Sequence, residues 1–176
     1  MSTDGTPHKD VFLKPGEFHF GDAHTRVRTL LGSCVAITLW HPRRRVGGMC
    51  HFLLPSRIRP NGAERDSRYA NEAVECFLHE LERLNTPASE YQAKLFGGGS
   101  MFPTLQRSGG GDDGLAVPER NILAAESLMR THGFNVCARD LGGQGHRTII
   151  FDIWSGDVWC RHRPLLQDPA DLPSCP

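Results

Sequence analysis

Two apolar segments separated by a short polar turn stand out in the first third of the chain. The first, residues 35–40 (VAITLW), is rich in β-branched and apolar side chains, and the second, residues 46–54 (VGGMCHFLL), ends at Pro55. The sequence between them, HPRRR, is polar and contains a proline. This pattern predicts two antiparallel strands joined by a short loop.

Apolar residues recur every three or four positions in two later segments, as is typical of amphipathic helices. In the first segment the apolar positions are Tyr69, Ala73, Phe77, Leu81 and Leu84. Its glutamates, Glu72 and Glu75 among them, are expected largely on the opposite, polar side. The second helix is expected to begin near Pro118, a residue suited to a first helical turn, and to end near Gly133.

Shorter extended segments are predicted before, between and after these helices. They are residues 11–20 as two pieces around a Pro-Gly turn, 27–31, 93–96, 134–141, and a hairpin made of 147–154 and 157–161. The order strands, helix, strand, helix, strands predicts a single layered α/β domain with mixed or antiparallel sheets. We expect residues 1–10 to be a disordered N-terminus, 11–163 to be the folded domain, and 164–176 to be a loose proline-rich tail.

Composition narrows the classes of function that fit this domain. The 176 residues contain 20 Lys and Arg against 20 Asp and Glu, so no basic field favours nucleic-acid binding. No apolar run approaches the roughly 18 residues of a membrane span, and the polar start MSTDGTPHKD lacks the apolar core of a signal peptide. The expectation is therefore a cytoplasmic protein without membrane insertion, in which most of the six cysteines are reduced thiols.

Cys34 and His51 are the candidate chemical pair. Cys34 follows Gly32-Ser33 at the head of the first apolar strand, and His51 lies in the second. Strand pairing could bring them together, and an imidazole can accept a thiol proton and later deliver it to a leaving group. The turn at Gly32 could also present backbone N–H groups to an oxyanion. The alternative is that both side chains simply fill the core.

Two other kinds of site are weaker candidates. Cys50-His51 and Cys160-Arg161-His162 contain zinc-ligand residue types, but without the tight paired spacing of structural zinc sites. The run FGGGS at residues 96–100 lacks both common nucleotide-binding glycine patterns, so close backbone approach is the better interpretation.

Several blocks of the sequence, in order, closely resemble the CheD family of chemotaxis proteins. These blocks are LLGSCVAITLWHP, VGGMCHFLLP, RYANEAV, AKLFGGGSMF, ERNI and DLGGQGHRTIIFDIWSGDV. The resemblance extends from about Leu13 to Arg161. The spacing of the G-S-C and H-F-x-L-P blocks and the two glycine-rich blocks make it specific.

The resemblance implies a protein-glutamine glutaminase, a Cys-His amidohydrolase that converts chemoreceptor glutamines to glutamate through a thioester. Its catalytic Cys and His fall here on Cys34 and His51. It implies a fold similar to deamidase toxins of the cytotoxic necrotizing factor type, and no metal or organic cofactor. The protein substrates would be methyl-accepting chemotaxis receptors, and a CheC-type phosphatase is a further possible partner.

The family's third active-site residue is a threonine on the strand before the cysteine. Counting without a gap places it at Arg28, with Thr29 next to it. Neighbours on a strand point to opposite faces, so only one of the two can serve, and we take Thr29 as the candidate. A plain structural threonine is the alternative.

Two other functions stay open at this level. The chain could be a non-catalytic binding partner of a CheC-type phosphatase, or a methylesterase that acts on receptor glutamate esters with the same thiolate. The presence of both Cys34 and His51 favours an enzyme over a binding module.

Overall fold

The computed structural model describes residues 9–101 and 114–165. The expected disordered N-terminus and loose tail lie almost wholly outside these residues, as does most of the loop before the second helix. The first strand begins at Lys9, two residues before the expected domain boundary, and the last ends at Arg163. The elements in chain order are β1 Lys9–Leu13, β2 Phe18–Gly21, β3 Thr25–Leu31, β4 Val35–His41, β5 Val46–Phe52, α1 Ala70–Arg83, the short 3-10 turn η1 Ala88–Glu90, β6 Gln92–Gly97, α2 Val117–Thr131, β7 Asn135–Leu141, β8 His146–Asp152 and β9 Asp157–Arg163.

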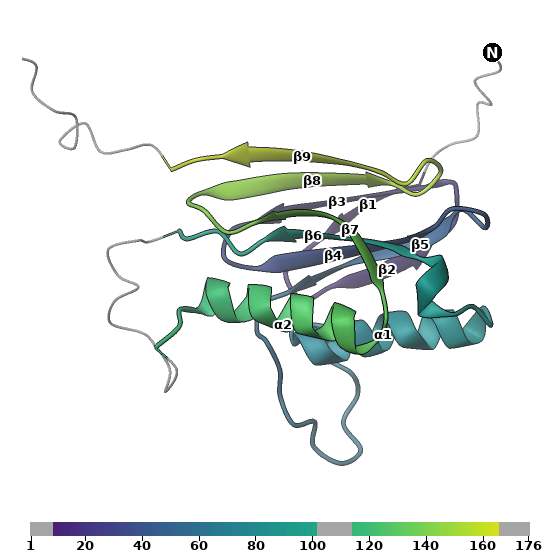
Figure 1. The fold of residues 1–176 in the computed structure, drawn as a ribbon, viewed down its shortest axis with the longest axis horizontal. Coiled ribbons are helices and arrows are strands. Elements are labelled where there is room, and N and C mark those ends of the chain that lie inside the picture. Colours follow the sequence, from purple (N-terminus) through teal and green to yellow (C-terminus); the bar gives the residue numbers. More distant parts are fainter. Residues whose placement is uncertain (1–8, 102–113, 166–176) are drawn as a thin grey trace, which may run out of the picture.

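The strands form two stacked sheets, and both helices lie on the outer side of one of them (Figure 1). The five-stranded sheet has the order β2-β5-β4-β6-β7 and faces the helices, whereas the four-stranded sheet has the order β1-β3-β8-β9. Each sheet has one parallel pair, β6 with β7 and β1 with β3, and is otherwise antiparallel. The predicted layered α/β fold with mixed sheets is confirmed, including the antiparallel pairing of β4 with β5.

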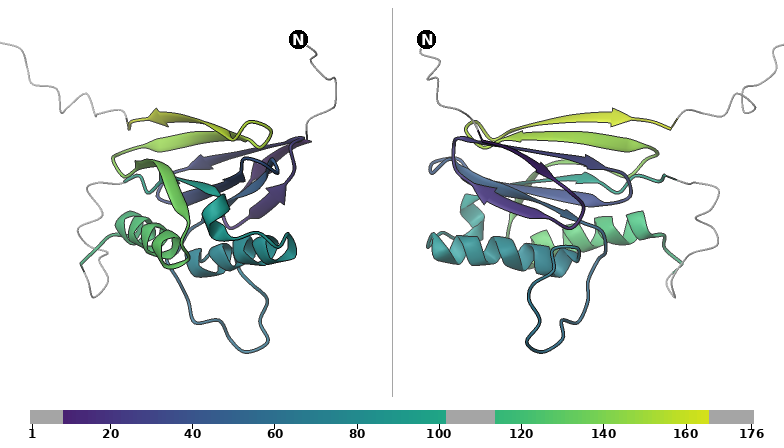
Figure 2. Two further views of the ribbon diagram at one scale, coloured as in Figure 1. Left: turned by 45° about the vertical axis from the view of Figure 1, so that its right-hand side comes forward. Right: turned by 180° about the vertical axis from the view of Figure 1, so that it is seen from behind.

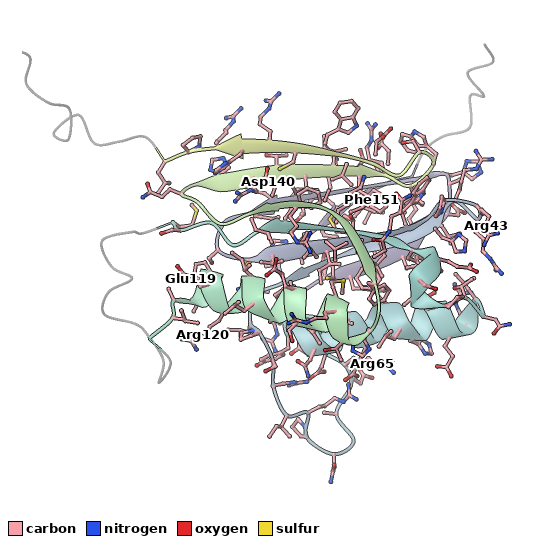
Figure 3. All side chains as sticks on the ribbon, viewed as in Figure 1. Arg43, Arg65, Glu119, Arg120, Asp140 and Phe151 are labelled. Carbon is pink, nitrogen blue, oxygen red and sulfur yellow. The ribbon has the colours of Figure 1, made fainter. Side chains whose placement is uncertain are left out.

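The five-stranded sheet is covered on both faces, and this explains the unbroken apolar runs in the sequence. One core lies between this sheet and the helices, and a second lies between the two sheets. Along β4, Ile37 belongs to the helix-side core and Ala36 to the inter-sheet core. A strand buried on both faces has no reason to alternate polar with apolar residues. Phe151 of β8 closes the inter-sheet core from the other side (Figure 3).

Helix α1 carries the predicted apolar stripe, but one of its polar positions is not where the pattern placed it. Glu72 is fully buried, although it was expected on the solvent side. The loop after β5 folds back over α1, and Arg57 in that loop donates a hydrogen bond of 2.5 Å from Nε to the Glu72 carboxylate. The expectation was wrong because helical periodicity carries no information on which distant loop covers a polar face.

Candidate active site

Cys34 lies at the end of the turn that joins the two sheets. Its half-buried side chain packs against the inter-sheet core, on the same side of β4 as Ala36. Its backbone is held by the glycine run after β6, because the Gly98 N–H donates to the Cys34 carbonyl at 2.7 Å. At Gly97, where φ is 110°, an added Cβ would lie 2.2 Å from that carbonyl oxygen. The predicted close backbone approach at FGGGS is therefore confirmed.

His51 lies on the neighbouring strand and faces the same inter-sheet layer. Ala36 of β4 pairs directly with His51 of β5, so Cys34, two residues before Ala36, is a diagonal neighbour of His51 on that face. The histidine is only 1% exposed. Its backbone is fixed on the other side, since its N–H donates to the Glu17 carbonyl and its carbonyl accepts from Gly16. The fold thus brings together the two residues that the sequence analysis paired.

Thr29 contacts the imidazole directly, and Arg28 does not. The Thr29 hydroxyl donates to the Leu13 carbonyl at 2.8 Å and lies 2.7 Å from His51 Nδ1. A hydroxyl has one proton, so this arrangement makes Nδ1–H the donor to Thr29 and leaves Nε2 as the basic nitrogen. Arg28 points to the outer face of its sheet, where its Nε donates to Asp10.

Burial keeps both members of the pair neutral. It lowers the pKa of His51 to about 4, a shift that the charge of nearby Glu17 only partly opposes. Burial also raises the pKa of the Cys34 thiol, against a smaller opposing effect of a hydrogen bond with Ser33. A neutral imidazole beside a protonated thiol is ready to act as a base, and the thiolate forms only when the proton moves.

Two polar side chains that sequence reasoning did not single out hold this site in place. The first is Asn121 of α2, which is fully buried. Its amide nitrogen donates to the Leu53 carbonyl at 2.8 Å and to the Ser33 carbonyl at 3.3 Å. It therefore ties the residue before Cys34 to the end of the histidine strand. Its place in the ERNI block was the available signal.

The second is Arg147 of β8, whose side chain is 2% exposed. It forms an ion pair with Asp140 at 2.9 Å and donates to the Gly142 carbonyl at 2.8 Å. The two glycine-rich loops meet beside it, where the Ser100 N–H donates to the Gly143 carbonyl. The first of these loops also contacts the turn before Cys34, because the Gly99 N–H donates to the Gly32 carbonyl. The frame of the cysteine turn thus depends on the DLGGQGHR block.

One nitrogen and one oxygen atom at this site have no hydrogen-bond partner within the described residues. They are His51 Nε2 and Asn121 Oδ1, both buried. Buried polar atoms without a partner are uncommon, and they concentrate where a substrate or water completes the arrangement. The open Nε2 is the nitrogen that the tautomer leaves basic.

The residues considered for zinc are separated by the fold. Cys50 faces the helices while His51 faces the other sheet, and Cys160 lies 3.3 Å from Asp140. Within residues 9–101 and 114–165 no group of three or more His, Cys, Asp or Glu side chains could hold a metal ion. In the same part of the chain, no helix has the length and apolar character needed to cross a membrane.

Comparison with known proteins places this geometry in context. The model of the CheD family, described as CheD chemotactic sensory transduction, matches residues 53–162. The probable chemoreceptor glutamine deamidase CheD of Pseudomonas fluorescens (strain SBW25) is 50% identical over 163 residues, which cover 92% of this chain and 90% of that protein. The probable chemoreceptor glutamine deamidase CheD 3 of Dechloromonas aromatica (strain RCB) is 46% identical over 161 residues, 90% of this chain and 91% of that protein.

The chain is also similar to solved structures, of which one is named here. The crystal structure of YlmD from Geobacillus stearothermophilus shares 13% identity with a TM-score of 0.42, over 72% of this chain and 51% of that one.

Proposed function

Because this chain belongs to the CheD family, we propose that it is a chemoreceptor glutamine deamidase that converts receptor glutamines to glutamate and releases ammonia. The relatives that carry this description cover nearly the whole chain. One observation supports the assignment of the chemistry to Cys34, His51 and Thr29. It is the hydrogen-bonded series from the Leu13 carbonyl through Thr29 to His51 Nδ1, which leaves Nε2 as the basic nitrogen of a residue that the strand register makes a diagonal neighbour of Cys34.

The first half of the reaction makes a thioester. His51 Nε2 takes the Cys34 proton as the sulfur attacks the carbon of the glutamine side-chain carboxamide. Collapse of the tetrahedral intermediate breaks the carbon–nitrogen bond, and the imidazolium gives its proton to the departing ammonia. Thr29 keeps the ring in the required tautomer throughout because its own proton is committed to Leu13.

The second half hydrolyses the thioester. Water loses a proton to His51 Nε2 and attacks the acyl carbon, and the cysteine leaves as a thiolate that recovers the proton. The products are the free thiol and a glutamate side chain whose carboxyl group releases its remaining proton to solvent, so atoms and charge balance without a metal or an organic cofactor. We assign the oxyanion to backbone N–H groups of the turn around Ser33 and Cys34, where a developing negative charge would lie.

The proposed substrates also indicate the cell compartment and the binding partners of the protein. Chemoreceptor segments that carry the target glutamines would be reached from the cytoplasm, so we assign the protein to that compartment. A CheC-type phosphatase would be a regulator that binds the enzyme. A chain that serves only to bind would not need the buried Thr29–His51 arrangement.

The test is deamidation of a purified receptor cytoplasmic fragment, read as ammonia release and as a gain of about one dalton at a glutamine. Cys34→Ala should lower the rate by roughly 10⁴-fold or more, and His51→Gln by about 10²- to 10⁴-fold. Both variants should keep the circular dichroism spectrum and melting temperature of a folded protein. Absence of conversion by the wild type, together with tight binding to a CheC-type phosphatase, would favour the binding-partner function.

A further inference from the structure

The peptide unit between Leu13 and Lys14 lies at the end of the series of hydrogen bonds that orients His51. Its carbonyl oxygen accepts the Thr29 hydroxyl at 2.8 Å. Its other polar group, the Lys14 N–H, donates to the Glu17 carboxylate at 2.8 Å. Because a peptide unit is planar and its C–N bond has partial double-bond character, its two polar groups are electronically coupled. One peptide unit therefore connects a carboxylate to the hydroxyl that holds the imidazole.

The sequence of the turn after β1 explains why Glu17 reaches this N–H. Residues 14–17 (KPGE) form a tight turn in which the Glu17 N–H donates to the Lys14 carbonyl at 3.1 Å. Proline suits the second position of such a turn, and Gly16, with a φ of 85°, suits the third. The turn brings residue 17 back to residue 14, so the Glu17 side chain closes on the backbone of its own turn.

The same turn is also bound to the strand that carries His51. The last paired residues of β2 and β5 are Phe18 and Cys50. One residue further, His51 donates its N–H to the Glu17 carbonyl at 3.1 Å and accepts the Gly16 N–H at 2.7 Å. The turn joins β1 to β2, each an edge strand of its own sheet, and both strands lie in front when the molecule is seen from behind (Figure 2). Glu17 is thus held beside the histidine strand by its backbone as well as by its side chain.

The charge of Glu17 acts on His51 in the direction that this geometry favours. Burial lowers the pKa of His51, and the negative charge of Glu17 raises it. Hydrogen bonds in series polarise one another, so a carboxylate on the Lys14 N–H makes the Leu13 carbonyl a stronger acceptor. The Thr29 oxygen then becomes a stronger acceptor for Nδ1–H of the imidazole. Since Glu17 is exposed, salt should screen part of its effect.

Other titratable groups lie on the elements packed around His51. They are Cys34 before β4, His19 of β2, Lys14 after β1, Arg147 of β8 with its partner Asp140, and the outward pair of Arg28 with Asp10. None of them is changed when Glu17 is replaced, so their contributions cancel when the wild type and the variant are compared at one pH.

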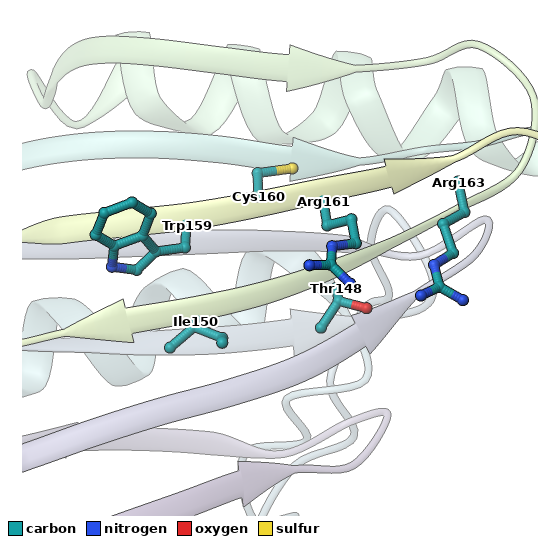
Figure 4. Close-up of a pocket in the computed structure, with 6 residues that line it drawn as sticks. All are labelled: Thr148, Ile150, Trp159, Cys160, Arg161 and Arg163. Carbon is teal, nitrogen blue, oxygen red and sulfur yellow. The ribbon is translucent and has the colours of Figure 1, made fainter.

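The hollow in the surface of the four-stranded sheet lies apart from this series. It has a volume of about 420 Å³ and is lined by Thr148, Ile150, Trp159, Cys160, Arg161 and Arg163 of β8 and β9 (Figure 4). Glu17 follows β1, which is the opposite edge of that sheet. Replacing Glu17 therefore leaves the hollow unaltered, and a change in the chemistry of His51 would not come from it.

We propose that Glu17 is a positioning residue of the deamidase, whose carboxylate acts through the Leu13–Lys14 peptide and Thr29 to favour the protonated form of His51. The proposal rests on the deamidase function, in which the imidazolium forms as Cys34 loses its proton and later protonates the departing ammonia. A negative charge at the far end of the series stabilises this imidazolium, while the buried peptide and hydroxyl keep the carboxylate itself away from the reacting atoms.

Alkylation of Cys34 by iodoacetamide at low salt tests this role without a receptor, because the thiolate is the reactive form and His51 accepts its proton. Mass spectrometry of the Cys34 peptide separates this rate from those of the other cysteines. Near pH 7, Glu17→Gln should lower the rate by about 3- to 10-fold. Above about pH 9 the difference should shrink, because hydroxide then removes the thiol proton directly. The glutamine oxygen can still accept the Lys14 N–H, so the melting temperature should not change.

A double-mutant cycle shows whether the hydrogen-bonded series carries the effect. Thr29→Val removes the hydroxyl between the peptide and the imidazole. In that background, Glu17→Gln should change the alkylation rate by less than about 2-fold. The same factor in both backgrounds would show that Glu17 acts directly through space, and the proposed path would then be wrong.

Asp22→Asn is the matched control. Asp22 is also an exposed carboxylate that accepts an N–H of its own turn, from His24 at 3.0 Å, but it lies at the other end of β2. Its replacement removes the same charge and should leave the alkylation rate unchanged. With a receptor cytoplasmic fragment as substrate, Glu17→Gln should lower kcat by about 3- to 10-fold and leave KM unchanged, whereas Asp22→Asn should alter neither.

Three further results would overturn the proposal. The first is a wild-type alkylation rate in folded Glu17→Gln. The second is an equal loss of rate in Asp22→Asn, which would indicate general charge rather than this series. The third is a raised KM with an unchanged kcat in Glu17→Gln, which would make Glu17 a contact for the receptor instead. Failure of the wild type to deamidate, with alkylation rates as expected, would count against the enzymatic function and leave the link between Glu17 and His51 intact.

Discussion

Glu72 and His51 are both buried titratable groups, but the surroundings of Glu72 satisfy its hydrogen bonds, whereas those of His51 leave one ring nitrogen available. Glu72 receives hydrogen bonds from Arg57 and from the Asp66 N–H, and Arg59 lies 3.6 Å away. Its carboxylate is fully paired, and the hydrogen bond from Arg57 lowers its pKa. His51 has one nitrogen bonded to Thr29, and its other nitrogen has no hydrogen-bond partner in the part of the chain that the structure describes.

The comparison shows that a buried group can be held in either its ionised or its neutral form, depending on its neighbours. Around Glu72, positive charge and N–H groups stabilise the ionised form, so the residue fastens a loop to α1. Around His51, burial without a countercharge close enough to compensate stabilises the neutral form, so the residue keeps a free lone pair. Completeness of hydrogen bonding, rather than burial itself, distinguishes the two.

The largest effect should come from disrupting the buried hydrogen bonds of Glu72 with Arg57 and Asp66. Glu72→Ala leaves the Arg57 guanidinium and the Asp66 N–H without their acceptor, and should lower the free energy of unfolding by about 3 kcal/mol. Deamidation per folded molecule should stay near the wild-type value. Urea unfolding and a rate assay at low temperature would measure the two quantities. A large loss of rate in fully folded Glu72→Ala would show that the cluster is not only structural.

His51 and Glu72 should affect the free energy of unfolding in two different pH ranges. His51 has a folded pKa of about 4, below its ordinary value of 6.5, so the unfolded chain binds its proton first as pH falls. Stability is then complete above 6.5 and is lost as pH falls toward 4, by about 2 kcal/mol between pH 8 and pH 5. The contribution of Glu72 is lost only as pH falls below the ordinary carboxyl pKa of 4.5, since its folded pKa is lowered.

His51→Gln isolates the histidine part of this dependence. Glutamine does not titrate, so the variant should lose less stability than the wild type between pH 8 and pH 5, as measured by urea unfolding at each pH. His19, whose pKa burial also lowers, contributes equally to both proteins and cancels in the difference. Parallel curves for the two proteins would contradict the assigned burial of His51.

Substitutions of Thr29 test whether its hydroxyl holds His51 in the tautomer that carries the proton on Nδ1. Thr29→Val removes the acceptor for Nδ1–H and should reduce kcat by about 10- to 100-fold, whereas Thr29→Ser should retain most of the activity. The pH profile of kcat should change in the valine variant, because the histidine loses the bond that holds its proton on Nδ1. Equal losses in the serine and valine variants would mean that the methyl group, and hence packing, matters instead.

Asn121 should give the smallest effect of the series. Asn121→Ala leaves the Ser33 and Leu53 carbonyls without its amide, so we expect kcat to fall about 10-fold with little change in KM. Asn121→Asp offers no amide hydrogens and should behave similarly. An unchanged kcat in a variant that only melts earlier would limit Asn121 to stability.

Patterns along the chain predicted much of the fold. The strand pair β4–β5, the stripe of α1 and the beginning of α2 near Pro118 follow from hydrophobic spacing and proline chemistry, because these depend on neighbours in sequence. The division into two sheets did not follow, since β3 pairs with β8 across more than 100 residues. The prediction that Glu72 is exposed to solvent was wrong for the same reason, because the loop that buries it is not part of the helix pattern.

The sequence by itself determined which side chains could do the chemistry. The residue types suited to acyl transfer are Cys34 behind Gly-Ser, His51 in an apolar run and a threonine on the preceding strand. Only the tertiary structure shows which of Arg28 and Thr29 contacts His51, because strand alternation sends Arg28 outward to Asp10 and Thr29 inward to the imidazole. It alone set the protonation states as well, since a pKa depends on what surrounds a group in space, and those neighbours come from strands and loops far apart in the chain.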